Sequence, residues 1–231
     1  MATQDELKQK AAAKAVEYVK SGMVVGLGTG STTEFALERI AERLKSGDLT
    51  HIAGIPSSTR TAKKAQGLGI ALVDFDDHQE IDVTIDGADE VDPELNLIKG
   101  GGGALLREKV LAQASRRNVI IVDESKLVPK LGTKWALPIE VIPFACRTEE
   151  KYLFSLAGDV TLRTTDTGSP YRTEQNNFIL DAKFDKIADP YYLAAQLNER
   201  AGIVEHGLFL RLANDVIVAA EGEIKHLKRS S

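Results

Sequence analysis

The sequence predicts an α/β fold with two domains: a Rossmann-like parallel sheet with helices on both faces, and a smaller ferredoxin-like α+β domain. Segments with strand and helix patterns alternate over the first 135 residues, an order typical of a parallel sheet covered by helices. The segment NVIIVDE is an unbroken apolar run, as expected of a strand buried on both faces. After Trp135 the order becomes strand, helix, strand, strand, helix, strand, which matches a split βαβ unit.

The first domain is predicted to cover residues 1–135 and 211–231. Its helices are expected where apolar residues recur every three or four positions, and its strands where short apolar runs occur. Because RLANDVIVAA contains a further apolar run, we expect it to return to the first sheet as a final strand. The predicted helices are 4–20, 31–45, 58–67 and 104–116, and the predicted strands are 23–27, 51–55, 71–73, 81–85 and the NVIIVDE run.

The second domain is predicted to cover residues 136–210. The turn-rich segment TTDTGSPYRTEQN is expected to join its two middle strands, because it is dense in glycine, proline and small polar residues. The predicted elements are strand 137–142, helix 148–157, strand 159–164, strand 177–181, helix 190–200 and strand 203–210.

Composition limits the classes of function. With 231 residues, 43% of them hydrophobic, the chain can bury a sizeable core. The net charge of −5, with lysine and arginine spread throughout, argues against a nucleic-acid partner. No apolar run approaches the roughly 20 residues that cross a bilayer, so no membrane partner is expected. The charged, helix-forming N-terminus does not resemble a signal peptide, which favours a cytoplasmic protein.

Cysteine and histidine give no support for a disulfide or a metal site. Cys146 is the only cysteine, which excludes an internal disulfide, and we expect a buried structural thiol rather than a nucleophile. The basic segment KHLKR near the C-terminus is interpreted as a solvated end. No metal is expected, because the histidines are far apart and lack ligand spacing: His51, His78, His206 and His226.

The segment VVGLGTGSTTEF is predicted to hold a phosphate. Three alternating glycines lead from an apolar strand into an amphipathic helix, so backbone N–H groups and the helix N-terminus can surround an anion. A Rossmann fingerprint would need glycine where Ser31 stands, and a Walker loop would need lysine where Gly30 stands. A phosphate monoester is therefore favoured, held with the hydroxyls of Thr29, Ser31 and Thr32. A tight turn without a ligand is the alternative.

The segment IDVTIDGADEVD places two carboxylates directly after a predicted strand. Gly87 and Ala88 allow a tight turn between Asp86 and Asp89, so both carboxylates would face the pocket. Ligands of such sheets bind at the carboxyl ends of the strands. Acidic turns are commonly only solvated, however, and the functional interpretation depends on the neighbouring segments.

A lysine followed by four glycines strengthens the functional interpretation. Lys99 precedes Gly100, Gly101, Gly102 and Gly103. Because four glycines are entropically costly to fix, close approach of the backbone to a ligand explains the run better than a structural linker does.

The helix after these glycines carries a candidate base. Its apolar spacing places Glu108 near an otherwise apolar face, where removal from water would make the carboxylate a better base. The alternative is a glutamate at the margin of the core, paired with a lysine. Lys126, in VDESKLV just past the next strand, adds another cation at the same edge of the sheet.

Together these residues suggest proton transfer on a small phosphorylated polyol. Isomerisation of an aldose to a ketose needs a base that moves a proton between neighbouring carbons and donors that hold the enediolate oxygen. A further carboxylate can manage hydroxyl protons during ring opening. General base catalysis supplies about 10² to 10⁴ in rate and one oxyanion donor about 10² to 10³, so several groups are required.

The motifs GLGTGSTT, IDGADEVD, IKGGGGALLREK and VDESKLV, in this order, resemble the signatures of the type A ribose-5-phosphate isomerases. The resemblance extends from TQDELK to GLFLRLANDVIV, nearly the whole chain. It implies interconversion of ribose 5-phosphate and ribulose 5-phosphate without a cofactor, in the non-oxidative branch of the pentose phosphate pathway. It also implies a homodimer or a dimer of dimers.

The resemblance further implies roles for individual residues. By the resemblance, Glu108 is the base that shuttles the proton between C1 and C2. Our own hypotheses are that Asp86 or Asp89 serves in hydroxyl proton transfer and ring opening, and that Lys99 stabilises developing negative charge. The residues expected to bind the substrate are Thr29, Gly30, Ser31, Thr32, Asp86, Gly87, Ala88, Asp89, Lys99, Gly100, Gly101, Gly102 and Lys126.

Two other functions fit part of the pattern. A sugar-phosphate sensor would share the parallel sheet but would need no base, and it should carry a DNA-reading or partner domain for which the chain has no room. An amino-sugar phosphate isomerase-deaminase would move protons in a similar way, and it would release ammonia from glucosamine 6-phosphate.

Overall fold

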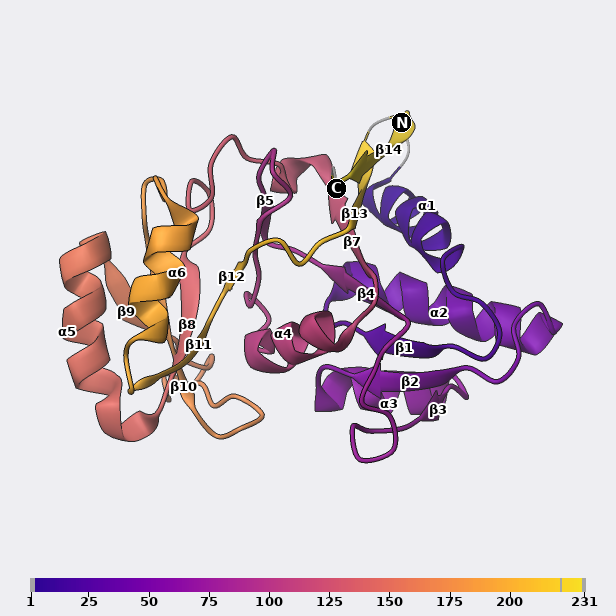
Figure 1. Cartoon of the computed structure of the whole chain (residues 1–231), viewed down its shortest axis with the longest axis horizontal. Coiled ribbons are helices and arrows are strands. Elements are labelled where there is room, and N and C mark those ends of the chain that lie inside the picture. Colours follow the sequence, from indigo (N-terminus) through magenta and orange to yellow (C-terminus); the bar gives the residue numbers. More distant parts are fainter. Residues whose placement is uncertain (1–2, 221, 230–231) are drawn as a thin grey trace. The chain divides into compact units, whose positions relative to one another are not determined.

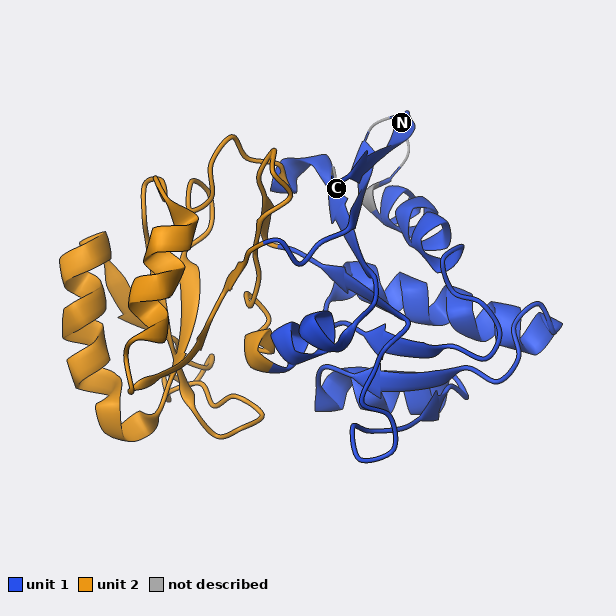
Figure 2. Ribbon diagram, in the orientation of Figure 1, with its two compact units in different colours: residues 1–88, 107–126, 211–231 blue, residues 89–106, 127–210 orange. Residues whose placement is uncertain are grey.

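The protein forms two compact units in a computed structural model that describes residues 3–220 and 222–229 (Figures 1 and 2). Unit 1 comprises residues 1–88, 107–126 and 211–231, and unit 2 comprises residues 89–106 and 127–210. Residues 1–2, 221 and 230–231 of unit 1 lie outside the described residues. Residues 89–106 and 127–135 thus group with unit 2, whereas the sequence placed them in the first domain. The domain boundaries at 136 and 210 stay a prediction.

A seven-stranded sheet forms the centre of unit 1. Its strands are β1 (Val24–Leu27), β2 (Ala53–Pro56), β3 (Ala71–Leu72), β4 (Val83–Gly87), β7 (Asn118–Asp123), β13 (Asp215–Ala220) and β14 (Glu223–Lys228). They lie in the order β14-β13-β7-β4-β1-β2-β3, and all neighbours are parallel except β13 and β14. The predicted parallel sheet is confirmed, including the return of the RLANDVIVAA segment as β13.

Helices pack on both faces of this sheet, as predicted. Val25 and Leu27 of β1 share a core with residues of α1 (Gln4–Val16), α2 (Ser31–Ser46) and α3 (Thr59–Gly67). Val24 instead packs in a second cluster with Leu111 of α4 (Leu105–Ala114). Because successive side chains of a strand point to opposite faces, the two clusters lie on opposite sides of the sheet.

The helix α2 forms where the sequence is amphipathic. Its buried residues recur at helical spacing and give one apolar face, and Gly47 ends the helix in the left-handed region at φ 81°. Its N-terminus is placed at the carboxyl end of β1 by a short loop. The buried residues of α2 are Thr33, Ala36, Leu37, Ile40 and Ala41.

The carboxyl edge of the sheet brings three predicted motifs of unit 1 side by side. β4 lies between β1 and β7, so the glycine loop after β1, the end of β4 and the segment after β7 are neighbours. The chain leaves β1 toward β2 on one side and returns with β4 on the other, which makes this position a topological switch point. Ligands of open α/β sheets bind at such points.

One predicted strand boundary was wrong in a way that matters for the site. The sequence placed a strand at 81–85 with Asp86 after it, but β4 continues to Gly87. Asp86 and Gly87 pair with Ile120 and Ile121 of β7, so the backbone ladder continues past the last apolar residue. Asp86 is therefore a residue of the sheet and not of a free turn.

Unit 2 contains the predicted split βαβ unit. Its elements are β8 (Leu137–Val141), the short 3-10 helix η2 (Pro143–Ala145), α5 (Cys146–Ala157), β9 (Val160–Leu162), β10 (Phe178–Ala182), α6 (Pro190–Asn198) and β11 (Ile203–His206). The four strands form an antiparallel sheet in the order β11-β8-β10-β9. Residues of this sheet and of both α-helices share one core, which confirms the smaller α+β part of the fold.

A second, three-stranded sheet in unit 2 was not predicted. Its strands β5 (Glu90–Val91), β6 (Leu97–Ile98) and β12 (Leu208–Phe209) have two residues each, too few to show alternation. The predicted strand 203–210 is instead two strands, β11 and β12, separated by Gly207. Most of the KHLKR segment pairs with β13 as the edge strand β14, in which no residue is fully buried.

Candidate active site

The glycine loop between β1 and α2 needs glycine because side chains crowd it. A Cβ atom on Gly28 would lie 2.2 Å from Oδ1 of Asp86, and one on Gly26 would lie 1.8 Å from Oγ1 of Thr84. Gly30 adopts φ 133° at the N-cap of α2, where no side chain caps the helix. The first N–H groups of a helix have no partner within it, so this N-terminus suits an anion.

Asp86 lies against this loop. Its Oδ1 accepts hydrogen bonds from the N–H groups of Thr29, at 3.2 Å, and Gly87, at 2.7 Å. The residue is only 2% exposed. Two backbone donors therefore fix the carboxylate at the carboxyl end of β4.

Four hydroxyl side chains meet beneath the loop. Oγ1 of Thr29 lies 2.7 Å from Oγ of Ser57, 2.8 Å from Oγ of Ser58 and 3.0 Å from Oγ1 of Thr61. Ser57, Ser58 and Thr61 are buried residues that follow β2 and begin α3. Sequence reasoning missed their role, although the run PSSTRT after a strand adjacent to β1 was an available signal.

Lys8 is a second residue that sequence reasoning missed. Its Nζ lies 3.5 Å from Oγ of Ser31 and 4.0 Å from a carboxylate oxygen of Asp5, and its side chain is 14% exposed. Ser31 is the first residue of α2 and Lys8 belongs to α1. No spacing in the sequence could connect them, because only the packing of α1 against α2 brings the ammonium group to the glycine loop.

In unit 2, Asp89 holds the glycine run. Oδ2 of Asp89 accepts a hydrogen bond from the N–H of Gly101 at 2.8 Å, and the N–H of Asp89 donates to the carbonyl of Ile98 at 2.8 Å. Arg163 donates from Nη1 to the carbonyls of Gly100, at 2.9 Å, and Gly101, at 3.1 Å. Hydrogen bonds to the Asp89 carboxylate and from the Arg163 guanidinium therefore hold the backbone of the glycine run in place.

The glycines of this run are required by backbone conformation and by space. Gly100 and Gly103 adopt φ 105° and 82°. A Cβ atom on Gly101 would lie 2.8 Å from Oδ1 of Asp89, and one on Gly103 would lie 2.3 Å from the hydroxyl oxygen of Tyr171. The phenol of Tyr171, which lies next to Gly103, is partly buried, and this burial raises its pKa.

Lys99 and Glu108, the predicted cation and base, are both buried. Lys99 is 4% exposed, its Nζ lies 5.5 Å from the ring centre of Phe209, and its N–H donates to the carbonyl of Gly207 at 2.9 Å. Glu108 is 4% exposed on α4 and belongs to unit 1. Charged side chains are rarely buried without a reason, which makes both residues candidates for function.

The predicted site residues are divided between the two units. Unit 1 holds the glycine loop, Asp86, Gly87, Ala88 and Glu108, together with Lys126, which ends the short helix η1 (Glu124–Lys126) after β7. Unit 2 holds Asp89 and the segment 99–102. Within the units, the contacts described above join Thr29 to Asp86 and Asp89 to Gly101.

Other chemistry has little support in the described part of the chain. No group of three or more histidine, cysteine, aspartate or glutamate side chains there could hold a metal ion. No described helix is long and apolar enough to cross a membrane. Cys146 is buried at the start of α5, and its burial raises the pKa of the thiol, which disfavours the reactive thiolate.

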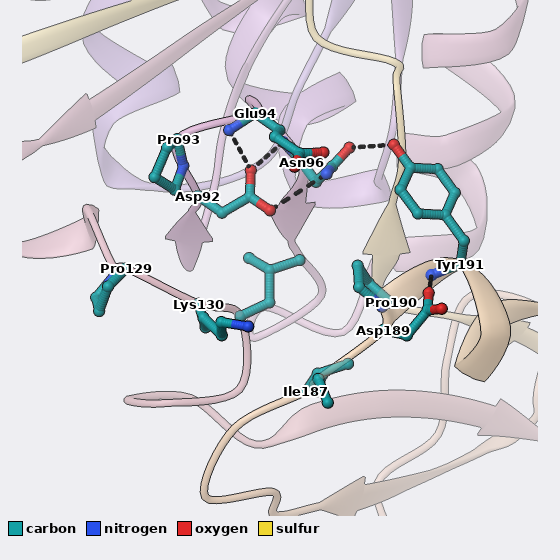
Figure 3. Close-up of a pocket in the computed structure, with 12 residues that line it drawn as sticks. Asp92, Pro93, Glu94, Asn96, Pro129, Lys130, Ile187, Asp189, Pro190 and Tyr191 are labelled. Carbon is teal, nitrogen blue, oxygen red and sulfur yellow. Dashed lines mark hydrogen bonds between the residues drawn. The ribbon is translucent and has the colours of Figure 1, made fainter.

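A cavity of about 350 Å³ in unit 2 is lined by none of the predicted site residues (Figure 3). The polar groups of its wall bond to one another: Asp92 accepts from Asn96, and the Tyr191 hydroxyl donates to Oδ1 of Asn96 at 3.2 Å. Asp189 in the same wall caps α6 by accepting from two backbone N–H groups. These bonds give the cavity wall a structural role.

Comparison with known proteins agrees with the motifs. A model of the family described as ribose 5-phosphate isomerase A (phosphoriboisomerase A) matches residues 53–223. Ribose-5-phosphate isomerase A of Desulfatibacillum aliphaticivorans is 58% identical, over 99% of both chains. A probable ribose-5-phosphate isomerase of Arabidopsis thaliana is 48% identical, over 96% of this chain and 86% of the relative.

Solved structures show the same likeness over the whole chain. A D-ribose-5-phosphate isomerase in complex with phospho-erythronic acid superposes with a TM-score of 0.95 at 40% identity, covering 99% of this chain and 100% of the other. The ribose 5-phosphate isomerase A of Methanocaldococcus jannaschii superposes with a TM-score of 0.92 at 39% identity, covering 98% and 100%. The chain therefore belongs to the ribose 5-phosphate isomerase A family.

Proposed function

We propose that this member of the family interconverts ribose 5-phosphate and ribulose 5-phosphate by moving one proton between C1 and C2 through an enediolate, with Glu108 as the base. The observation that carries this assignment is the burial of the Glu108 carboxylate on α4, at 4% exposure. A carboxylate is a suitable general base for a carbon acid, and its burial in a predicted site is the structural feature that supports this role.

The enediolate oxygens need stabilisation as negative charge develops. We assign this to Lys99 and to the backbone N–H groups of Gly100 and Gly102, since the N–H of Gly101 donates to Asp89. The support is the burial of Lys99 and the fixed conformation of the glycine run, which is held by Asp89 and Arg163. Preorganised donors stabilise an oxyanion without having to reorganise during the reaction.

Opening of the sugar ring requires a group that accepts and returns a hydroxyl proton. We assign this to Asp86 or Asp89, and we propose that Gly87, the last residue of β4, and Ala88 contact the substrate between them. Each carboxylate is oriented by backbone N–H groups, Asp86 by those of Thr29 and Gly87, and Asp89 by that of Gly101. Lys126 is proposed as a further substrate contact.

The phosphate group is assigned to the N-terminus of α2. Gly30, Ser31 and Thr32 would supply N–H groups and hydroxyls, and the uncapped helix end adds partial positive charge. Lys8, with its Nζ 3.5 Å from Oγ of Ser31, would supply a full charge. A phosphorylated sugar acid, such as the phospho-erythronic acid bound to the similar structure, would place a carboxylate where the enediolate carries two oxygens.

We also propose a cytoplasmic location, a place in the pentose phosphate pathway, and a homodimer or dimer of dimers. The support is the use of cysteine, since the sequence has a single cysteine and hence no internal disulfide. The oligomeric state is checked by light scattering on the purified protein, and a monomer at working concentration would contradict this part of the proposal.

The function is tested by incubating the purified protein with ribose 5-phosphate in EDTA and following ketose formation. Metal-independent turnover is the expected result. Binding of the sugar phosphate without turnover would favour a sensor, and ammonia release from glucosamine 6-phosphate would favour an isomerase-deaminase. Either result would replace the proposed function.

A further inference from the structure

Thr29 has two groups that can donate a hydrogen bond, and the backbone one is already engaged. Its N–H donates to Oδ1 of Asp86 at 3.2 Å. Gly28, the residue before it, has no Cβ, and the Asp86 carboxylate occupies the space that a Cβ would need. The loop and the carboxylate are therefore packed directly against each other.

Thr29, Ser57, Ser58 and Thr61 form a hydroxyl cluster. The group that accepts the hydroxyl proton of Thr29 follows from a count of the protons in this cluster. Each hydroxyl carries one proton. Ser57 donates to the carbonyl of Leu27 at 3.0 Å, and Thr61 donates to the carbonyl of Gly28 at 3.0 Å. Ser58 donates to Thr61 at 3.0 Å. With these three protons directed elsewhere, the contacts of Thr29 are explained only if Thr29 itself is the donor.

The proton of Thr29 therefore goes to Ser57, at 2.7 Å, to Ser58, at 2.8 Å, or to Thr61, at 3.0 Å, all of them inside the cluster. A phosphate dianion only accepts hydrogen bonds, and it needs a donor from every group that binds it. The N–H of Thr29 donates to Asp86, and its O–H donates within the hydroxyl cluster. Thr29 therefore has no further N–H or O–H group to donate to a phosphate oxygen.

We infer that Thr29 is a positioning residue that orients Asp86 and anchors the glycine loop to Ser57, Ser58 and Thr61, and does not itself bind the substrate phosphate. This inference rests on the proposed function, and it divides the segment 29–32 into two parts. Gly30, Ser31 and Thr32 face the phosphate, whereas Thr29 ties the end of β1 to the start of α3 and to the carboxylate on β4.

The cluster suits this task because it holds backbone as well as side chains. Ser57 and Thr61 bind the carbonyls of the two residues that precede Thr29, and Ser57, Ser58 and Thr61 are each at most 6% exposed. A shift of the loop would break several of these bonds together. The position of the Asp86 carboxylate therefore depends on hydroxyls that follow β2.

The test compares Thr29→Val, which keeps the shape and removes the hydroxyl, with Thr29→Ser, which keeps the hydroxyl. Ser31→Ala serves as the reference for loss of a phosphate contact. For each variant, kcat and KM for ribose 5-phosphate are measured, together with the inhibition constant of inorganic phosphate. Thermal melting and the variant Ser57→Ala show whether an effect comes from the cluster or from loss of the folded protein.

We expect Thr29→Val to lower kcat about tenfold, as when one orienting hydrogen bond is lost, while the phosphate inhibition constant changes less than about twofold. Thr29→Ser should restore kcat, Ser57→Ala should lower it in the same way, and Ser31→Ala should raise the inhibition constant. A rise in the inhibition constant of Thr29→Val as large as that of Ser31→Ala, with kcat intact, would overturn the inference. So would wild-type kinetics in Thr29→Val. Failure of the proposed function is distinguishable, because it would show as absence of isomerase activity in the wild type.

Discussion

Arg117, which precedes β7, donates from Nε to Oδ2 of Asp215, the first residue of β13, at 2.7 Å. The Asp215 side chain is 1% exposed and also accepts from the Tyr18 hydroxyl, at 3.1 Å, and from Nε2 of His226 on β14, at 2.7 Å. The Arg117 guanidinium lies 4.6 Å from the ring centre of Tyr18. One carboxylate thus joins two neighbouring strands, the edge strand and the segment after α1.

This cluster predicts loss of stability in acid. Burial alone raises the pKa of Asp215, but the hydrogen bonds from Arg117, His226 and Tyr18 outweigh burial and hold the pKa below its usual value. A carboxyl whose folded pKa is lowered stabilises the protein above its unfolded pKa, and this contribution is lost as the pH falls through the folded value. We therefore expect the free energy of unfolding to decrease below about pH 4.

Asp215→Asn should remove this contribution at neutral pH. Because the hydrogen bonds to the buried carboxylate would be weakened while the half-exposed Arg117 can be solvated, we expect the free energy of unfolding at pH 7 to fall by about 1 to 2 kcal/mol. Denaturant unfolding at pH 7 and pH 3 measures both values, with the exposed Asp77→Asn as the control. The variant should also lose less stability than the wild type between pH 7 and pH 3. Equal losses would contradict the assignment to Asp215.

Glu108→Gln tests the proposed base. The change keeps the size of the side chain and removes its basicity, so we expect kcat to fall by about 10² to 10⁴ with KM changed only a few-fold. Ketose formation from ribose 5-phosphate measures both constants. Glu199→Gln, at an exposed glutamate that follows α6, should behave as the wild type. Near-normal turnover of Glu108→Gln would show that another group removes the proton.

The main elements and the binding motifs could be predicted because both are local in the sequence. The apolar runs of β7 and β13 and the helical spacing of α2 need no knowledge of distant residues. The glycine loop and the glycine run are likewise continuous segments. Their residue types limit the backbone and the ligand before any packing is known.

What could not be predicted depends on contacts between distant segments. Glu90, a fully buried carboxylate next to Asp89, accepts hydrogen bonds from the N–H groups of Gly132, Lys134 and Trp135, more than forty residues away. In the sequence Glu90 was only one of several acids in IDGADEVD. The contacts of Lys8 with Ser31, 23 residues away, and of Asp215 with Arg117, 98 residues away, are also beyond the range of any periodicity or motif.

Gly28→Ala tests the packing of Asp86 against the glycine loop. A Cβ atom at this position would lie 2.2 Å from Oδ1 and 2.7 Å from the Cα atom of Asp86, so both side chain and backbone must move. We expect kcat to fall at least about tenfold and the free energy of unfolding to fall by about 1 to 3 kcal/mol, as for an overpacked core.

The matched control is Gly67→Ala, at the last residue of α3, where a Cβ atom would meet nothing within 4 Å. Alanine favours a helix over glycine by up to about 1 kcal/mol, so this variant should be as stable as the wild type or more stable, with unchanged kcat. If Gly28→Ala behaved like Gly67→Ala, the position of the Asp86 carboxylate would not depend on its close packing against Gly28.

Lys8→Ala tests whether the ammonium group beside Ser31 takes part in phosphate binding. A hydrogen bond to a charged group contributes about 1.5 to 3 kcal/mol, so its loss should raise KM for ribose 5-phosphate at least about tenfold. The reacting carbons would be unaffected, and kcat should therefore stay within about twofold of the wild type. Steady-state kinetics separate the two constants.

Lys10→Ala provides the matched control, because Lys10 belongs to the same helix and is exposed. If charge near the substrate matters only through the overall field of the protein, the two variants should raise KM equally, and both effects should disappear at high salt. If Lys8 contacts the phosphate, only Lys8→Ala should raise the inhibition constant of inorganic phosphate, and Lys8→Arg should recover part of the binding. An unchanged KM in Lys8→Ala would show that Lys8 does not bind the phosphate. The phosphate would then be bound only by the N-terminus of α2 with Ser31 and Thr32.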